Sequence, residues 1–319
     1  MKTSTISRRS LLSGAALSLA VAAAARPAMA QTAPFSSGSG TARLRAPALA
    51  CDSHLHIFDT RFPASPHWTG QPVEDATLEA YRAVQKRIGT TRAVIVNPST
   101  YGVDNRCTLE ASARLGQDGR AVVVVEPDIS EAELEEMAAQ GATGVRVNFV
   151  TPQSWGETTV DRLRETAARV APLGWHVQIY ARAEQIVAMQ DALSDLPVPL
   201  VIDHLGRLPP AAGPSDPAFA VIRRLLDRGR TWVKLSGAYL NTEIGPPDYP
   251  DATAMARAYA EAAPERVVWG SDWPHRGQSQ LPDDAALFDL LETWAPDEAV
   301  QHRILVENPA ELYQFGGGG

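Results

Sequence analysis

Cysteine is scarce in this chain of 319 residues, where only Cys51 and Cys107 occur. Two cysteines cannot form the disulfide framework of a small secreted domain, and neither has the CxxC spacing used for metal binding or redox chemistry. Cys51 lies in a predicted core strand, and Cys107 lies near the start of a predicted helix. We therefore expect two buried, unpaired thiols, although an oxidising compartment would permit a disulfide between them.

Long hydrophobic runs are also lacking. The uncharged apolar stretch at residues 11–25 is shorter than the roughly 20 residues that span a bilayer, and no later stretch qualifies. It follows SRRSLL at residues 7–12 and precedes AMA at residues 28–30, a pair of motifs typical of a twin-arginine signal peptide and its cleavage site. We therefore predict a signal peptide at residues 1–30 and export of the folded protein to the periplasm.

Basic residues are fewer than acidic ones, 29 against 37, so the formal net charge is −8. Loss of the signal peptide removes Lys2, Arg8, Arg9 and Arg26 and no acid, which brings −8 to −12. An acidic chain without a basic run argues against nucleic acids and anionic membranes as partners. We expect a small-molecule ligand, while the oligomeric state stays open.

The chain is predicted to carry one folded domain. Residues 31–46 (QTAPFSSGSGTARLRA) are small and polar and show no periodicity, so they are predicted to be a disordered linker, and residues 316–319 are predicted to be a flexible tail. Residues 47–315 remain, and single α/β barrels commonly have about 250 residues.

Short apolar runs alternate with amphipathic helical patterns throughout this domain. The segments EAYRAVQKRIG and AFAVIRRLLDRG are examples of the helices, and both end on glycine, the usual helix stop. Eight such units predict an α/β fold, a single (β/α)8 TIM barrel. A doubly wound open sheet is the alternative, but no GxGxxG motif follows the first strand. The predicted strands span residues 49–54, 92–97, 121–126, 143–148, 175–180, 200–204, 231–236 and 267–271.

Two histidines lie one residue apart at the end of the first predicted strand, in CDSHLHIFD at residues 51–59. Side chains alternate along a strand, so His54 and His56 point the same way. At the carboxyl end of a barrel strand, two imidazoles can chelate a metal ion or polarise a substrate carbonyl. Alone, the pair is explained equally well as a hydrogen-bonded surface pair.

Polar residues at the ends of four other strands favour a site. His204 follows strand six in IDHLGR and Asp272 follows strand eight in VVWGSDWPH, while Tyr180 ends strand five. Arg146 and Asn148 share one face of strand four. Each has a structural explanation alone, such as a satisfied core histidine or a paired arginine. Core packing, however, does not require polar groups at the same end of five strands, where barrel enzymes build their active sites.

In these motifs the sequence resembles the amidohydrolase superfamily. STYGVDN, GVRVNF, GWHVQIY, IDHLGR and VVWGSDWPH resemble more narrowly its branch of 2-pyrone-4,6-dicarboxylate hydrolases and sugar-lactone hydrolases. The resemblance covers residues 49–314. It implies a hydrolase that acts on a cyclic ester and opens the ring of a small acidic lactone of the sugar-lactone, muconolactone or pyrone type.

The resemblance also implies a role for each matching residue. Asp272 matches the general base that takes a proton from the attacking water. Three histidines match the groups that polarise the lactone carbonyl, directly or through a metal ion: His54, His56 and His204. Three further residues match positions that hold carboxylate or hydroxyl groups of the substrate: Arg146, Tyr180 and Arg207.

Several neighbouring residues are less clearly assigned. Asn148 is expected to join the substrate-binding set. Trp273 and His275, which follow the predicted base, either wall the substrate or only pack against it, and Tyr239 in the loop after strand seven has the same two readings. Lys234 lies within a strand, where a buried salt bridge is the expected role.

The resemblance argues against a binuclear metal centre. Binuclear amidohydrolases use a lysine on strand four and a histidine at the end of strand five, where this chain has Arg146 and Tyr180. Two alternatives stay open: no metal, or one divalent ion, most plausibly zinc, on His54, His56 and Asp272.

Departures from the family pattern narrow the substrate and the reaction. The stretches NFVTPQSW and KLSGAYLN lack arginines that the resemblance places after strands four and seven, which disfavours a substrate with two carboxylates. Retention of Asp52 and Asp272 favours hydrolysis over a galactarolactone-type isomerase. A nonoxidative decarboxylase would need the missing strand-five histidine. A degenerate barrel that only binds ligand would not need the complete set of three histidines and Asp272.

Overall fold

The computed structural model describes residue 1 and residues 32–151 and 158–316. The predicted signal peptide beyond its first residue, part of the loop after strand four and the last three residues of the predicted tail lie outside the described residues. Eight parallel strands form one sheet in sequential order. All eight predicted strands are confirmed, each within a few residues of its expected bounds. They are β1 (Cys51–Leu55), β2 (Arg92–Val96), β3 (Gly119–Val123), β4 (Ala142–Asn148), β5 (His176–Tyr180), β6 (Leu200–Ile202), β7 (Thr231–Leu235) and β8 (Val267–Trp269).

The sheet closes where β1 meets the segment that follows β8. The backbone N–H of His56 donates to the carbonyl of Trp273 at 2.8 Å. Nearer the amino end of β1, the buried carboxylate of Asp52 accepts hydrogen bonds from the Ser271 hydroxyl at 2.6 Å and the Tyr81 hydroxyl at 2.9 Å. The predicted single (β/α)8 barrel is therefore confirmed, and the doubly wound open sheet is wrong.

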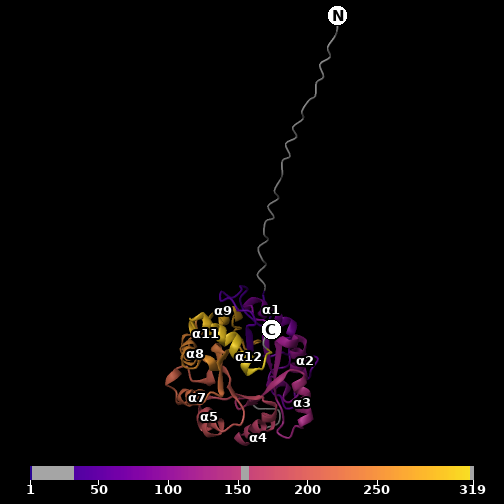
Figure 1. Cartoon of the computed structure of the whole chain (residues 1–319), viewed down its shortest axis with the longest axis vertical. Helices are drawn as coiled ribbons and strands as arrows, with labels where there is room; N and C mark the ends of the chain where they lie inside the picture. The colour runs from indigo at the N-terminus through magenta and orange to yellow at the C-terminus, as the bar shows by residue number, and fades with distance from the viewer. Residues whose placement is uncertain (2–31, 152–157, 317–319) are drawn as a thin grey trace.

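Helices surround the strands as an outer ring (Figure 1). Helix α1 illustrates why they form: the Thr77 side chain accepts from the Ala80 N–H at its start, and Gly89 ends it in the left-handed region at φ 81°. The helices are α1 (Leu78–Ile88), α2 (Arg106–Leu115), α3 (Glu131–Ala139), α4 (Val160–Val170), α5 (Ala183–Ala188), α6 (Gln190–Ser194), α7 (Pro217–Asp227), α8 (Pro250–Ala262), α9 (Asp284–Asp289), α10 (Leu291–Trp294), α11 (Glu298–His302) and α12 (Asn308–Leu312).

A separate small core fills the barrel near the amino ends of its strands. Inward-facing side chains of the strands, among them Val94, Val201 and Val268, pack there against Tyr313 and Phe315 from the end of the chain. Arg92 at the start of β2 donates to the Gly316 carbonyl, and Arg120 at the start of β3 donates to the Tyr313 carbonyl. These hydrogen bonds hold the C-terminal segment in place. The amino end of the barrel is thereby plugged, which leaves the carboxyl end for a site.

Residues 33–44 differ from the disordered linker that their composition predicts. The Phe35 ring packs edge-on against Trp273 with ring centroids 5.8 Å apart, and the Pro34 carbonyl accepts from the Trp273 indole N–H at 2.9 Å. The buried guanidinium of Arg87 donates to the carbonyls of Ser37 and Gly40. Residues with short side chains leave these backbone carbonyls accessible, so a segment without periodicity still finds fixed partners on the barrel.

Both thiols are buried and unpaired, as predicted. Burial raises the pKa of Cys107 to about 12. A thiol with such a pKa stays protonated at neutral pH and is a poor nucleophile or metal ligand.

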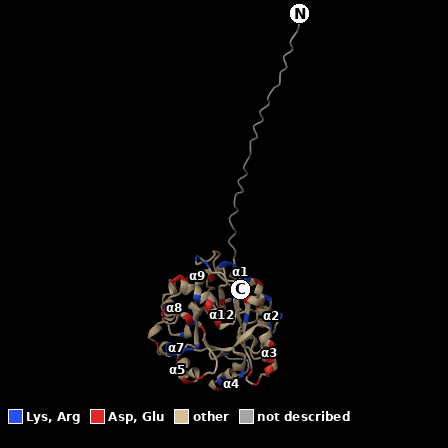
Figure 2. Ribbon diagram, viewed as in Figure 1, with Lys and Arg blue, Asp and Glu red and all other residues tan. Residues whose placement is uncertain are grey.

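Charged residues of both signs are interspersed around the ring of helices (Figure 2). Among the helices in the described ranges, none has both the length and the hydropathy needed to cross a membrane.

Candidate active site

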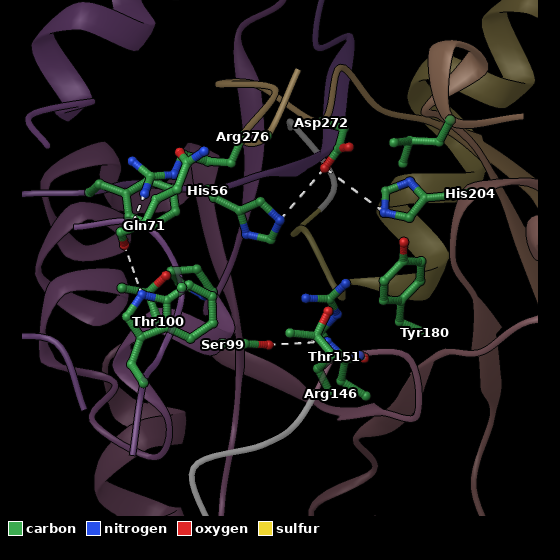
Figure 3. A pocket seen from close by; sticks show the side chains of 17 residues that line it. His56, Gln71, Ser99, Thr100, Arg146, Thr151, Tyr180, His204, Asp272 and Arg276 are labelled. Carbon is green, nitrogen blue, oxygen red and sulfur yellow. Dashed lines mark hydrogen bonds and ion pairs between the residues drawn. The ribbon is translucent and has the colours of Figure 1, made fainter. Parts of the chain in front are cut away.

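A cavity of about 330 Å³ opens at the carboxyl end of the barrel. Figure 3 shows polar side chains from several strand ends pointing into it. Six of the predicted site residues line this cavity: His56, Arg146, Asn148, Tyr180, His204 and Asp272. His54 is fully buried just beneath them.

The two carboxylate oxygens of Asp272 have different neighbours. Oδ1 lies 3.5 Å from His54 Nε2, 3.6 Å from His56 Nε2 and 3.9 Å from His204 Nε2. Oδ2 accepts a hydrogen bond from the Tyr239 hydroxyl at 2.6 Å. One oxygen is thus anchored, while the other faces the three histidines across the cavity floor.

The environment of Asp272 suits a general base. Burial raises the pKa of this carboxyl to about 6, an effect that the hydrogen bond from Tyr239 opposes. A base with a pKa near 6 is ionised at neutral pH yet is a stronger proton acceptor than an exposed aspartate. Its backbone lies in the left-handed region at φ 60°, and its N–H donates to the His54 carbonyl at 2.8 Å. This turn brings the carboxylate over the end of β1.

Tyr239 begins a hydrogen-bonded chain that leads away from the cavity. Its hydroxyl lies 3.1 Å from His275 Nδ1, and His275 Nε2 lies 3.1 Å from Asp284 Oδ1. Both His275 and Asp284 are buried. Tyr239 was expected either to wall the substrate or to pack, and the structure instead makes it the partner of the predicted base.

Three residues predicted to bind substrate do not line the cavity: Arg207, Trp273 and His275. His275 lies behind Tyr239, and Trp273 is fully buried between Phe35 and Tyr81. The chain turns sharply after strand eight, with positive φ at both Asp272 and His275, so the alternation of a strand does not continue through these residues. Of the two roles expected for Trp273 and His275, walls of the substrate cavity or packing, the structure therefore shows packing behind the cavity.

His56 has a defined tautomer. Its Nδ1 lies 2.7 Å from the Val96 carbonyl oxygen, which can only accept, so Nδ1 carries the hydrogen and Nε2 carries a lone pair. Burial, reinforced by the charge of Arg146, lowers the pKa of His56 to about 3, which keeps the ring neutral.

His54 connects the site to a polar cluster inside the barrel. Its Nε2 lies 3.3 Å from His56 Nε2, and its Nδ1 lies 3.1 Å from Lys234 Nζ. The Lys234 ammonium also donates to Gln178 Oε1 at 2.7 Å. Burial lowers the pKa of Lys234 to about 8, so the side chain remains charged at neutral pH. Burial and that charge together hold the pKa of His54 well below its ordinary value.

His204 presents Nε2 to the cavity while its Nδ1 lies 2.9 Å from the Ser236 hydroxyl. Burial keeps the pKa of this imidazole well below its ordinary value. A hydroxyl that donates to Nδ1 leaves the hydrogen of a neutral ring on Nε2, where it can bond a substrate oxygen.

The Arg146 guanidinium uses one nitrogen, Nε, in a hydrogen bond and has two terminal NH2 groups. Its Nε donates to Asp203 Oδ2 at 3.1 Å, and Gln178 Nε2 donates to the same oxygen at 3.1 Å. No hydrogen bond within the described residues engages the terminal amines, which point into the cavity in Figure 3. A planar fork of this kind matches the two oxygens of a carboxylate.

Arg207 acts on the cavity through Tyr180. It does not line the cavity, and its guanidinium donates to the Tyr180 hydroxyl at 2.6 Å. The Tyr180 hydroxyl keeps its own hydrogen for a ligand. Asn148 lines the cavity and donates to the Ser99 hydroxyl at 3.0 Å, which fixes both side chains at the wall.

Arg276 at the mouth of the cavity is not among the predicted site residues. It donates to the Glu74 carboxylate at 2.6 Å and to the Pro72 carbonyl at 2.8 Å. It thereby ties the loop after β1, which carries Trp68 and Gln71 on the cavity wall, to the loop after β8. No local sequence pattern signals this contact, because it joins two irregular loops.

Gln178 and Asp203 are also missing from the predicted set, although the sequence does mark the inner polar positions of Gln178 and Lys234. Gln178 in HVQIY and Lys234 in WVKLS interrupt otherwise apolar strands. A polar residue at an inward position of a buried strand needs partners, so such interruptions point to a polar cluster inside the barrel.

By distance alone, His54, His56 and Asp272 could hold a metal ion. Their facing atoms lie 3.3 to 3.6 Å apart. In a tetrahedral zinc site with bonds of about 2.0–2.1 Å, two ligand atoms are about 3.3 Å apart, so the spacing is close to that of such a site. The hydrogen bonds do not match this use. With Lys234 donating to its Nδ1, His54 carries hydrogen on Nε2, the atom that would have to ligate the metal.

Comparison with known proteins agrees with the fold and the motifs. A family model described as amidohydrolase matches residues 51–315. The chain is 34% identical over 271 residues to a 4-sulfomuconolactone hydrolase of Rhizobium radiobacter, covering 83% of this chain and 89% of that one. It is 34% identical over 282 residues to a 2-pyrone-4,6-dicarboxylate hydrolase of Comamonas testosteroni, covering 85% and 92%.

Two further relatives bear on the reaction and the ligand. A D-galactarolactone isomerase of Agrobacterium fabrum is 32% identical over 282 residues, covering 87% of this chain and 95% of that one. A probable 2-pyrone-4,6-dicarboxylic acid hydrolase of Acinetobacter baumannii, solved with citric acid bound, superposes with a TM-score of 0.74 at 27% identity, covering 84% of this chain and all of that one. The family resemblance noted in the sequence is confirmed.

Proposed function

This chain belongs to the amidohydrolase family, and from that membership and its site we propose that it hydrolyses a small lactone that carries an anionic group. One observation carries the proposal: Asp272 Oδ1 faces three neutral histidines across a cavity into which Arg146 presents its free terminal amines. The first arrangement suits a base that activates water, and the second suits a substrate carboxylate.

The residues of this site can supply every group that the ring-opening step needs. Asp272 Oδ1 takes a proton from a water molecule as the water oxygen forms a bond to the lactone carbonyl carbon. The π electrons of the carbonyl move onto its oxygen, which a hydrogen on His204 Nε2 and the Tyr180 hydroxyl can stabilise. Pre-oriented donors in a buried site stabilise such an oxyanion far better than bulk water does.

The second half of the reaction returns the proton. The tetrahedral intermediate collapses, the bond between the carbonyl carbon and the ring oxygen breaks, and Asp272 gives its proton to the leaving alkoxide. The product is an open-chain hydroxy acid. Throughout these steps Tyr239 holds Oδ2, so the same carboxylate oxygen faces the water and then the leaving group.

A lactone isomerase is the second candidate, because one relative carries that name. Retention of Asp272, whose buried carboxyl has a pKa raised to about 6, favours hydrolysis. The nonoxidative decarboxylase and the ligand-binding degenerate barrel receive no support from the relatives. No step of this reaction uses a metal ion, because the hydrogen bonds of His54 do not fit one.

The test is a hydrolysis screen of the purified protein with a pH indicator, against sugar lactones, muconolactones and a pyrone dicarboxylate. We expect turnover of a lactone with one carboxylate. Asp272→Asn should lower kcat by about 10²–10⁴-fold, the usual contribution of a general base. Asp283→Asn is the matched control, since Asp283 pairs with Arg87 outside the cavity. If no lactone opens faster with the wild type than with Asp272→Asn, the hydrolase proposal is wrong.

We also propose that the protein acts in the periplasm. The support is the SRRSLL motif, the apolar stretch and the AMA site in the first 30 residues. Export in folded form suits a barrel that closes between β1 and the segment following β8, since the sheet can close only after that late segment has been made.

A further inference from the structure

Lys234 is a fully buried cation in the interior of the barrel. It lies on β7 between the plug at the amino end, where its ammonium is 5.8 Å from the Tyr313 ring, and the histidine pair of the cavity floor. Burial of an ammonium is costly unless its hydrogens are bonded. Its contacts therefore show what this charge holds in place.

Three groups surround the Lys234 ammonium. Gln178 Oε1 lies at 2.7 Å, His54 Nδ1 at 3.1 Å and Asp203 Oδ1 at 3.8 Å. An ammonium has three hydrogens and no lone pair, so it can only donate. His54 Nδ1 must then accept, which places the single hydrogen of this neutral ring on Nε2.

Asp203 is the competing partner for His54, and its geometry argues against that role. Asp203 Oδ1 lies 3.3 Å from His54 Nδ1, yet it has no hydrogen-bond partner within the described residues. The carboxylate is near the ring nitrogen but does not lie where a ring N–H would point. Lys234, in contrast, meets the geometric requirements of a hydrogen bond to Nδ1.

The hydrogen on His54 Nε2 has a ready acceptor. His56 Nε2 lies 3.3 Å away, and its lone pair is fixed there by the bond between His56 Nδ1 and the Val96 carbonyl. A continuous chain therefore runs from Lys234 through His54 and His56 to Val96, with every nitrogen used. The two Nε2 atoms that would have to ligate a metal ion are instead hydrogen-bonded to each other.

We propose that Lys234 is a positioning residue that holds His54 in the tautomer with hydrogen on Nε2 and thereby keeps divalent metal ions out of a site otherwise spaced for zinc. The proposal concerns the same site as the proposed function but does not depend on turnover. Without Lys234, His54 Nδ1–H could turn to the nearby Asp203 carboxylate. That pairing frees the Nε2 lone pair and is the carboxylate–histidine arrangement common behind metal ligands.

The first test measures metal binding without substrate. Wild type, Lys234→Met and Lys86→Met are dialysed against Zn²⁺ or Co²⁺, and bound metal is measured by elemental analysis and calorimetric titration. Lys86, on the outer helix α1, is the matched control. We expect Lys234→Met to bind one Zn²⁺ about 10–100-fold more tightly than the other two proteins, the range seen when the residues behind metal ligands change.

Tetrahedral Co²⁺ absorption in Lys234→Met, lost when His56→Gln is added, would assign the metal to the histidine pair. Stoichiometric metal on the wild-type histidines would overturn the proposal. A folded Lys234→Met protein with no gain in affinity would overturn it as well.

The second test needs no variant of Lys234, so it holds even if that variant does not fold. Long-range ¹H–¹⁵N spectra of the histidine-labelled wild type report which nitrogen of each ring carries hydrogen, with His54→Gln and His56→Gln used for assignment. We expect hydrogen on Nε2 of His54 and on Nδ1 of His56. Hydrogen on Nδ1 of His54 would contradict the proposal, whatever the outcome of the lactone screen.

Discussion

At the scale of single residues, burial and hydrogen bonding decide what each ionisable group can do. Asp272 and the histidines it faces share one buried floor, yet burial has opposite effects on them. It raises the pKa of the carboxyl and lowers the pKa of His54, His56 and His204, because it disfavours the charged form of each. The floor is thus built of neutral rings and one carboxylate that can accept a proton.

The raised pKa of Asp272 predicts the acid limb of the pH profile. A general base works when deprotonated, so kcat/KM should fall as the pH drops through about 6. Tyr239→Phe removes a hydrogen bond that lowers this pKa, so the limb should move to higher pH. The hydrogen bond that orients the Asp272 carboxylate contributes about 1–2 kcal/mol, so its loss should also lower kcat by about 10-fold with little change in KM.

The profile is measured from pH 4 to 9 on whichever lactone the screen identifies. Tyr81→Phe is the matched control, because Tyr81 donates to Asp52 outside the cavity. An acid limb that stays in place in Tyr239→Phe would show that Tyr239 does not act through Asp272.

At the scale of elements, five strands supply a polar group to the site near the residue where the strand ends and its loop begins. The barrel register brings Arg146 of β4 level with Gln178 of β5 and Asn148 level with Tyr180. Such pairs lie on neighbouring strands but are far apart in the chain. The contact between β1 and the segment after β8 is made through an isolated bridge and not a regular ladder of strand pairs. It carries the histidine pair on one side and Asp272 on the other.

Asp52 is predicted to secure that junction. Its carboxylate accepts from the Ser271 hydroxyl, the Ser271 N–H and the Tyr81 hydroxyl. Asp52→Ala leaves these buried donors unpaired, and we expect a loss of about 1–3 kcal/mol in the free energy of unfolding for each donor that water cannot reach. Urea titration followed by circular dichroism measures the change. Asp161→Ala on the exposed face of α4 should stay within about 0.5 kcal/mol of wild type.

At the scale of the whole molecule, the two ends of the chain have different places on the barrel. The C-terminal residues plug the amino end, and residues 33–44 lie along α1 and α9 beside Trp273. The segment that follows the predicted signal peptide is therefore part of the folded domain. A protein exported after folding would carry this segment already packed.

The export prediction concerns residues 8 and 9. Replacement of both arginines by lysine keeps the charge but removes the pattern that the twin-arginine route recognises, so the protein should remain in the cytoplasm. Cell fractionation followed by immunoblotting measures the distribution. Full export of the double-lysine protein, or export that persists in cells without a twin-arginine translocase, would contradict the assignment.

The sequence alone determined the barrel and the composition of its catalytic floor. Apolar runs with strand periodicity can be recognised locally, and the carboxyl ends of parallel strands must meet at one edge, so His54, His56, His204 and Asp272 could be brought together without coordinates. Arg146, Asn148 and Tyr180 follow by the same reasoning. The packing of residues 33–44 could not be predicted in this way, because several of their contacts use backbone carbonyls, which composition does not report.

The tertiary structure decided how the residues next to that floor are used. The turn after β8 directs Trp273 and His275 away from the cavity, and Arg207 reaches it only through Tyr180. Whether His54 presents a lone pair or a hydrogen depends on Lys234, which is 180 residues away in the chain. Hydrogen-bond direction depends on distances between atoms of different strands. Periodicity within one strand carries no information about such distances.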